Sequence, residues 1–196
     1  MNRLGIVAAV QQNFSAADAW HRKSLAIFEK QGDEHRASNA YHQIGIIAQK
    51  QGDLATAEVL FHKSVANKEK QGNERGAATT YHHLGIVAHK QHDFAAADAW
   101  YRKSLTIDEK QGNMHGAAST QGQLGILAAA QERYQDAAQW YVRCMSAFLK
   151  TNDKHAAAQT AHNFRIAFDA ADPASREKMK LTWQAANLGE LPAEAT

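Results

Sequence analysis

Apolar residues recur at three- and four-residue intervals along most of the chain, which is the spacing of one face of an α-helix. Between residues 34 and 51 they are Ala37, Ala40, Tyr41, Ile44, Ile47 and Ala48. The next stripe consists of Leu54, Ala57, Leu60, Phe61, Ser64 and Val65. No segment shows the alternation of apolar and polar residues that is typical of a strand. The pattern therefore predicts an all-α protein.

Short polar segments separate the predicted helices. Asp33 follows Gly32 and Asp53 follows Gly52; aspartate is a favourable N-cap, and glycine accepts the left-handed conformation that ends many helices. The sequence Glu-Lys-Gln-Gly stands at 29–32 and recurs forty and eighty residues later. These boundaries predict pairs of helices, in repeats that start near residues 1, 34, 74, 114 and 154.

Glycines in the middle of the first helix of each pair define the repeat. They are Gly5, Gly45, Gly85 and Gly125, at 40-residue intervals. A fixed period of this size indicates an array of stacked repeats. A glycine inside a helix costs roughly 1 kcal/mol relative to alanine, so glycines at one repeated phase indicate close helix–helix contact. We expect Ala97 to offer a small surface opposite Gly85, within an array that covers residues 1–170.

The two ends of the array differ from its interior. Asp172-Pro173 interrupts the pattern, and residues 171–188 are predicted to form a capping helix in which Met179 and Trp183 cover the last pair. Residues 189–196 are predicted to be a flexible tail. At the other end the first helix lacks its opening turns, so either it is short or the chain is a piece of a longer protein; we favour the second.

Composition narrows the possible partners. The net charge of +2 is too small to indicate binding to nucleic acid or to a membrane surface. A single cysteine excludes an internal disulfide framework and fits a reducing compartment. No apolar run approaches the roughly 20 residues that span a membrane. A cytoplasmic protein is the expectation.

The 11 histidines do not form a recognisable metal or catalytic motif. His82 and His83 are adjacent, so on a helix their side chains point about 100° apart. The chain has no His pair at i, i+4 spacing and no glycine-rich phosphate loop. Asp18 and Asp98 follow the repeat, with Glu58 at the equivalent position between them, which favours a repeated structural role over that of a single acid or base. We expect no enzymatic activity, no metal and no cofactor.

The repeated residues resemble the tetratricopeptide repeat. That motif places an aromatic residue three before Leu-Gly, followed by an alanine and a second aromatic on the next helix. Here the pattern reads Tyr81, Leu84-Gly85, Ala97 and Tyr101. The chain departs from the usual motif in its 40-residue period and in lacking the closing proline. The resemblance implies an α-solenoid of antiparallel helix pairs that forms a right-handed superhelix.

The resemblance also implies a binding surface. In such repeats the first helices line a concave groove, which holds an extended peptide or a partner helix. The positions that carry over as candidate contacts are Asn39, His42, Gln43, Gln49, Lys50, Thr79, His82, His83, His89, Lys90, Gln123, His162 and Asn163. Ile46, Ile86, Ile126 and Ile166 would form the floor. Such a groove suits a polar or acidic peptide, although any exposed helix face is also polar.

Three functions fit these observations. The first is a non-catalytic protein–protein interaction scaffold with a peptide or partner segment in the groove. The second is a self-assembling structural module, in which Leu4, Val7 and Phe14 at the N-terminal edge form a homodimer contact. The third is the sensor or docking arm of a larger multidomain protein.

Overall fold

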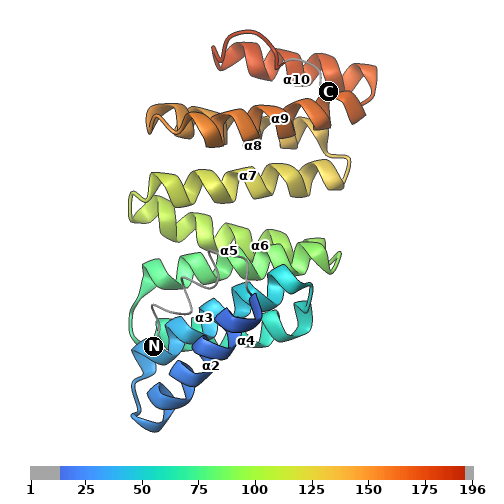
Figure 1. Ribbon diagram of the computed structural model, residues 1–196. Helices are drawn as coiled ribbons and strands as arrows, with labels where there is room; N and C mark the ends of the chain where they lie inside the picture. The colour runs from blue at the N-terminus through green and yellow to red at the C-terminus, as the bar shows by residue number, and fades with distance from the viewer. Residues whose placement is uncertain (1–13, 193–196) are drawn as a thin grey trace. The chain divides into compact units, whose positions relative to one another are not determined.

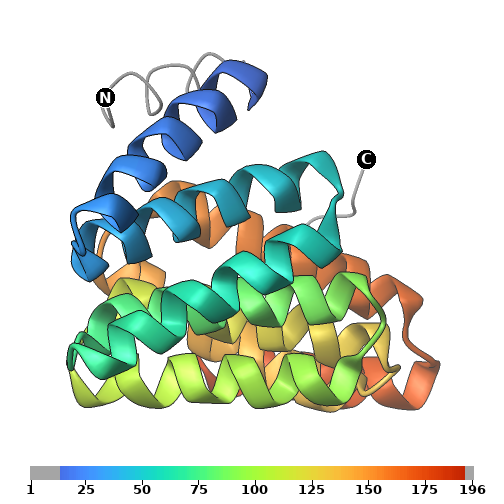
Figure 2. The same cartoon turned by 90° about the horizontal axis from the view of Figure 1, so that it is seen from below.

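The computed structural model describes residues 14–192 and is all-α, as predicted (Figure 1 and Figure 2). Successive helices pack as antiparallel pairs in a repeat array. In the described residues the helices are α2 (Phe14–Lys30), α3 (Glu34–Gln51), α4 (Leu54–Lys70), α5 (Glu74–Lys90), α6 (Phe94–Lys110), α7 (Met114–Ala130), α8 (Tyr134–Lys150), α9 (Lys154–Ala170) and α10 (Pro173–Ala185). The chain forms two compact units, which divide within α6 after Ser104. The predicted right-handed superhelix stays a prediction.

Side-chain caps start most of the described helices, and those at Asp33 and Asp53 were predicted from the sequence. The Asp33 carboxylate accepts a hydrogen bond from the backbone N–H of Arg36 at 2.8 Å, and Asp53 accepts one from the N–H of Thr56 at 3.1 Å. Asp172 caps α10 in the same way, with a proline at the first turn of that helix. Each cap satisfies a backbone donor that the helix cannot pair internally.

Turns with a left-handed residue end the helices at 20-residue intervals. Glycine takes this conformation at four of these positions, which are Gly32, Gly52, Gly72 and Gly112. His92, Glu132 and Asn152 take it without being glycine, with φ between 57° and 62°. A side chain with a Cβ is strained in this conformation by roughly 1–2 kcal/mol.

The mid-helix glycines lie against aromatic rings of the paired helix. A Cβ at Gly85 would lie 2.5 Å from the Tyr101 ring, and one at Gly125 would lie 2.7 Å from the Tyr141 ring. Gly45 has the same relation to Phe61, at 2.7 Å. The close contact was predicted with Ala97 opposite Gly85; the atoms nearest to a Cβ at Gly85 belong to the Tyr101 ring.

Each of these rings lies in the core of its own unit. In unit 1, which ends at Ser104, the Phe61 and Tyr101 side chains are fully buried. In unit 2, Tyr141 and Phe164 pack with the α10 residues Met179 and Trp183, whose exposed fractions are 0% and 1%. Met179 and Trp183 are thus buried against the last helices of the array, and their role as a terminal cap stays a prediction.

Hydrogen bonds connect the segment after α10 to side chains of α9 and α10. The Trp183 indole N–H donates to the carbonyl oxygens of Gly189 and Glu190, both at 3.2 Å. Arg165, on α9, donates to the carbonyl of Pro192 at 3.3 Å. The predicted flexible tail thus begins with residues that contact α9 and α10, and residues 193–196 lie outside the described part of the chain.

The glycine–aromatic contact makes the array sensitive to a side chain at Gly85. Gly85→Leu would overpack the contact with Tyr101, and we expect a loss of about 1–3 kcal/mol or more in the free energy of unfolding. Urea unfolding measures this loss. The double variant Gly85→Ala/Tyr101→Leu should be more stable than Gly85→Ala alone, because it removes the ring that the Cβ meets. If Gly85→Leu had the same free energy of unfolding as the parent, the close packing of Gly85 against Tyr101 would be contradicted.

Glu132→Gly should stabilise unit 2. Glu132 is exposed and has a φ of 59°. Relief of the left-handed strain exceeds the entropy that glycine adds to the unfolded chain, so we expect a net gain of about 0.5–1 kcal/mol. Thermal unfolding tests it, and Gly112→Ala, at an equivalent turn with a φ of 66°, should lower the melting temperature. A decrease for Glu132→Gly would be evidence against strain at this turn.

Candidate partner-binding surfaces

The first helices of the pairs in unit 1 are α3 and α5, and most predicted groove residues on them reach solvent. Asn39, Lys50, Thr79 and Lys90 are exposed, whereas Gln43, Gln49, His82, His83 and His89 are half-buried. We call these nine residues the polar face of unit 1. Gln49 and His83 connect the two helices, because Gln49 Oε1 lies 3.0 Å from His83 Nδ1.

His42 does not belong to this accessible face, which corrects the sequence prediction. Its side chain is 6% exposed. The ring lies 5.1 Å from that of His83 and 5.6 Å from that of Phe61, measured between centroids, and its Nδ1 is 3.2 Å from the Thr80 hydroxyl. Neighbouring helices therefore cover a side chain that the repeat pattern alone places on the surface.

A buried lysine lies next to His42. Lys68, on α4, is 3% exposed and donates a hydrogen bond from Nζ to the Thr80 hydroxyl at 3.0 Å. Burial lowers the pKa of Lys68 to about 8, because the charged form loses solvation. Sequence reasoning missed this residue. The available signal was that Lys68 stands where Phe28 and Phe148 stand in other repeats.

The histidines at the polar face are held neutral. Burial lowers the pKa of His82 to about 4 and that of His83 to about 3, and for His83 the neighbouring His82 adds to the effect. The His83 ring also stacks on Phe61, with centroids 5.3 Å apart. Among the described residues, no group of three or more His, Cys, Asp and Glu side chains is placed to hold a metal ion.

The net charge of the polar face of unit 1 is positive. Lys50 and Lys90 are exposed on it, and none of its nine residues is acidic. Glu58 of α4 accepts a hydrogen bond at 3.0 Å from Gln91, the residue after Lys90. The polar face thus offers two exposed lysines together with amide and hydroxyl groups, which suits a polypeptide that carries carboxylates.

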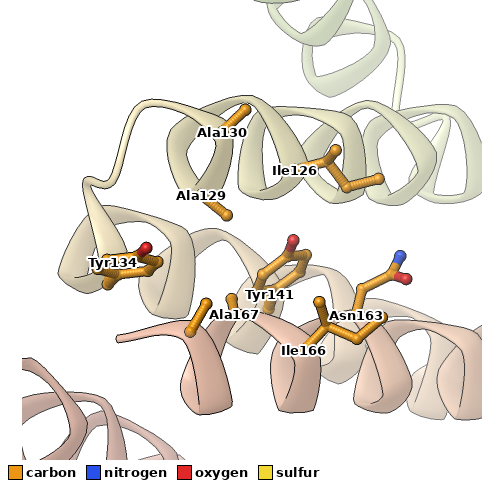
Figure 3. A pocket seen from close by; sticks show the side chains of 9 residues that line it. Ile126, Ala129, Ala130, Tyr134, Tyr141, Asn163, Ile166 and Ala167 are labelled. Atoms are coloured by element: carbon orange, nitrogen blue, oxygen red, sulfur yellow. The ribbon is translucent and has the colours of Figure 1, made fainter. Parts of the chain in front are cut away.

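The equivalent surface of unit 2 contains an apolar pocket of about 370 Å³ (Figure 3). We call it the α7–α9 pocket, and it is lined by Ile126, Ala129, Ala130, Tyr134, Tyr141, Asn163, Ile166, Ala167 and Ala170. The candidate contact Asn163 therefore lies in it. Gln123 is half-buried and His162 is exposed on the same two helices, but neither lines the pocket.

Small side chains on α7 account for this hollow. Ala129 and Ala130 stand where α3 has Gln49 and Lys50, so the space that long side chains occupy in one repeat is left open in another. Tyr134 and Tyr141 of α8 contribute aromatic walls. Sequence reasoning missed both tyrosines as pocket residues. The signal was the run Ile-Leu-Ala-Ala-Ala at 126–130, which puts apolar residues on the face predicted to be polar.

The structure bears on two further expectations, the homodimer contact at the N-terminal edge and the lack of a membrane span. Leu4, Val7 and Gly5 lie outside the described residues, and Phe14, the first residue of α2, is half-buried. The proposed homodimer edge therefore stays a prediction. In the described part of the chain, no helix has the length and apolar character needed to cross a membrane.

The low histidine pKa values predict a loss of stability in acid. His82 and His83 stay neutral in the folded protein, whereas in the unfolded chain they bind protons below about pH 6.5. The free energy of unfolding should therefore fall as the pH drops from about 6.5 towards 4, by about 1–2 kcal/mol per pH unit. Urea unfolding at several pH values measures the slope.

The variant His82→Gln/His83→Gln should reduce this slope, and part of it should remain because burial also lowers the pKa of His42 well below its usual value. The control His155→Gln/His162→Gln removes two exposed imidazoles and should keep it. Equal slopes for the parent and the His82/His83 variant would contradict a contribution of these two half-buried rings to the acid sensitivity.

Comparison with known proteins identifies the repeat. The family model of the tetratricopeptide repeat matches residues 1–70, 36–110 and 76–150. A search of curated proteins found no match. Among solved structures, BtubC (BKLC) from P. vanneervenii is similar with a TM-score of 0.76 and 16% identity, covering 98% of this chain and 82% of that one.

A second similar fold is that of the nearly identical TPR-like repeats of a Podosopora anserina protein assigned as a kinesin light chain. Its TM-score is 0.73 at 16% identity, over 95% of this chain and 91% of that one. A variant of the same repeats gives a TM-score of 0.74 at 15% identity with the same coverage. At these identities the likeness concerns the fold alone. With the family model matching most of its length, the chain belongs to the tetratricopeptide repeat family.

Proposed function

We propose that this protein is a non-catalytic interaction module that binds a protein segment along the first helices of its pairs. Tetratricopeptide repeats are generally protein–protein interaction modules, and stacked helical repeats create extended surfaces for such partners. The accessible positions of the polar face of unit 1 and the α7–α9 pocket of unit 2 support this proposal. The polar face lies on first helices, and the pocket lies between the first helices α7 and α9, with Tyr134 and Tyr141 of α8 also lining it. Both include positions where the family resemblance implies ligand contacts.

The finer proposal is that unit 1 binds a segment rich in Asp or Glu. The observation that carries it is the pair of exposed lysines, Lys50 and Lys90, on a face without any carboxylate. Asn39 and Thr79, which are also exposed there, can hydrogen-bond to a peptide backbone. His82 and His83 add no charge at neutral pH, because burial keeps both rings neutral. The lysines are therefore the cations that select an acidic ligand.

Charge reversal tests this assignment. Lys50→Glu/Lys90→Glu should weaken binding of an acidic peptide, selected from a random library on the parent protein, by at least about tenfold, because two attractions become repulsions. Isothermal titration calorimetry measures the dissociation constant. The affinity of the parent should also fall as salt rises, since exposed charges are screened.

The control is Lys30→Glu/Arg75→Glu, which makes the same change in net charge at two exposed positions outside the polar face. It should bind within about twofold of the parent if the effect is local. Equal weakening by both variants would mean that only net charge matters. No weakening by Lys50→Glu/Lys90→Glu would remove these lysines from the site.

A further inference from the structure

The α7–α9 pocket differs in chemistry from the polar face of unit 1. All its lining side chains are uncharged, and Asn163 is the one amide among alanines, isoleucines and tyrosines. We propose that this pocket binds one bulky apolar side chain, aromatic or leucine, of the partner segment. This inference rests on the proposed function, and it adds a specificity site that the lysines of unit 1 do not supply.

The size and lining of the pocket support this ligand class. A volume of about 370 Å³ lies at the lower end of the roughly 300–1,000 Å³ that is usual for ligand pockets. It therefore suits a large side chain with part of its backbone. A carboxylate or ammonium would lose its hydration in the pocket without meeting a countercharge among the lining residues, so charged side chains are excluded.

The walls come from all three helices of the pocket. Figure 3 shows Ile126 of α7 opposite Ile166 and Ala167 of α9, with the Tyr141 ring between these helices. The Ile166 side chain is 50% exposed, so the apolar surface is open to solvent. Exposed apolar surface in a hollow is typical of a binding site, and an entering aromatic ring would cover Ile166.

Asn163 favours a peptide as the source of that side chain. Its Oδ1 accepts a hydrogen bond from Gln159 Nε2 at 3.3 Å, which leaves the amide N–H₂ group as the donor towards a ligand. In Figure 3 the Asn163 amide lies beside Ile166, with its nitrogen on the side of α7. A donor next to an apolar hollow matches a residue whose backbone carbonyl lies beside its own side chain.

The first test uses single-residue probes on the full chain. N-acetyl amides of tryptophan, phenylalanine, leucine, alanine, lysine and aspartate are titrated to millimolar concentration, while NMR follows the methyl groups of Ile126 and Ile166. The three bulky apolar probes should give saturable shifts of both methyls, and the alanine, lysine and aspartate probes should not. Saturation by none of the bulky probes, or equally by the lysine probe, would overturn the proposal.

A matched pair of variants locates the binding. Ala130 and Ala158 are both exposed alanines on first helices, but only Ala130 lines the pocket. Ala130→Trp should fill the hollow and weaken binding of the tryptophan probe by at least about tenfold, whereas Ala158→Trp should bind it as the parent does. Ile166→Ser, at a half-exposed site, provides a second test if Ala130→Trp unfolds. If both Ala130→Trp and Ile166→Ser bound the tryptophan probe with the affinity of the parent, the proposed site would be refuted.

The outcomes also separate this inference from the proposed function. Lys50→Glu/Lys90→Glu should bind the tryptophan probe with the affinity of the parent, because those lysines belong to unit 1. A library-selected peptide that is weakened by the lysine variant but not by Ala130→Trp would leave the interaction function intact and disprove the pocket's role. Weakening by Ala130→Trp alone would support the pocket and disprove the acidic ligand.

Discussion

The contact between a glycine backbone and an aromatic ring is the constraint on which both units depend. Gly45, Gly85 and Gly125 each leave out a side chain where the ring of the paired helix lies, so close that a Cβ would be under 3 Å from it. The ring fills the core of its unit, and its contact with the glycine sets how closely the two helices of the pair approach each other. Because the contact recurs at one phase, it also fixes which positions of each first helix face away from the partner helix.

Since few residues define each pair, the other positions are free to differ. Unit 1 has long polar side chains such as Gln49 and Lys50 on its first helices, above a buried group in which Lys68 bonds to Thr80. Unit 2 has Ala129 and Ala130 at the equivalent positions, and a pocket results. The same backbone plan therefore presents a cationic surface in one unit and an apolar hollow in the other.

The features that the sequence predicted correctly are those that depend on residues close together in the chain. The all-α fold and the caps at Asp33 and Asp53 were predicted, because caps and apolar spacing are local signals. The sequence did not show that the Tyr101 ring lies nearest to Gly85 or that His42 is buried, because both depend on side chains of other helices. Tyr134 and Tyr141 were missed in the pocket for the same reason: repeat phase says which face a residue occupies, but not which cavity forms between three helices.

The two surfaces would contribute to binding in different ways. Exposed lysines such as Lys50 and Lys90 mainly accelerate encounter with an acidic chain, and each exposed ion pair adds only about 0–1 kcal/mol to affinity. An aromatic side chain buries about 150–250 Å², which at roughly 25 cal/mol per Å² is worth several kcal/mol before ordering costs. A partner that uses both surfaces would therefore be attracted by unit 1 and retained by unit 2. The pocket, rather than the charge, would then decide which acidic segment stays bound.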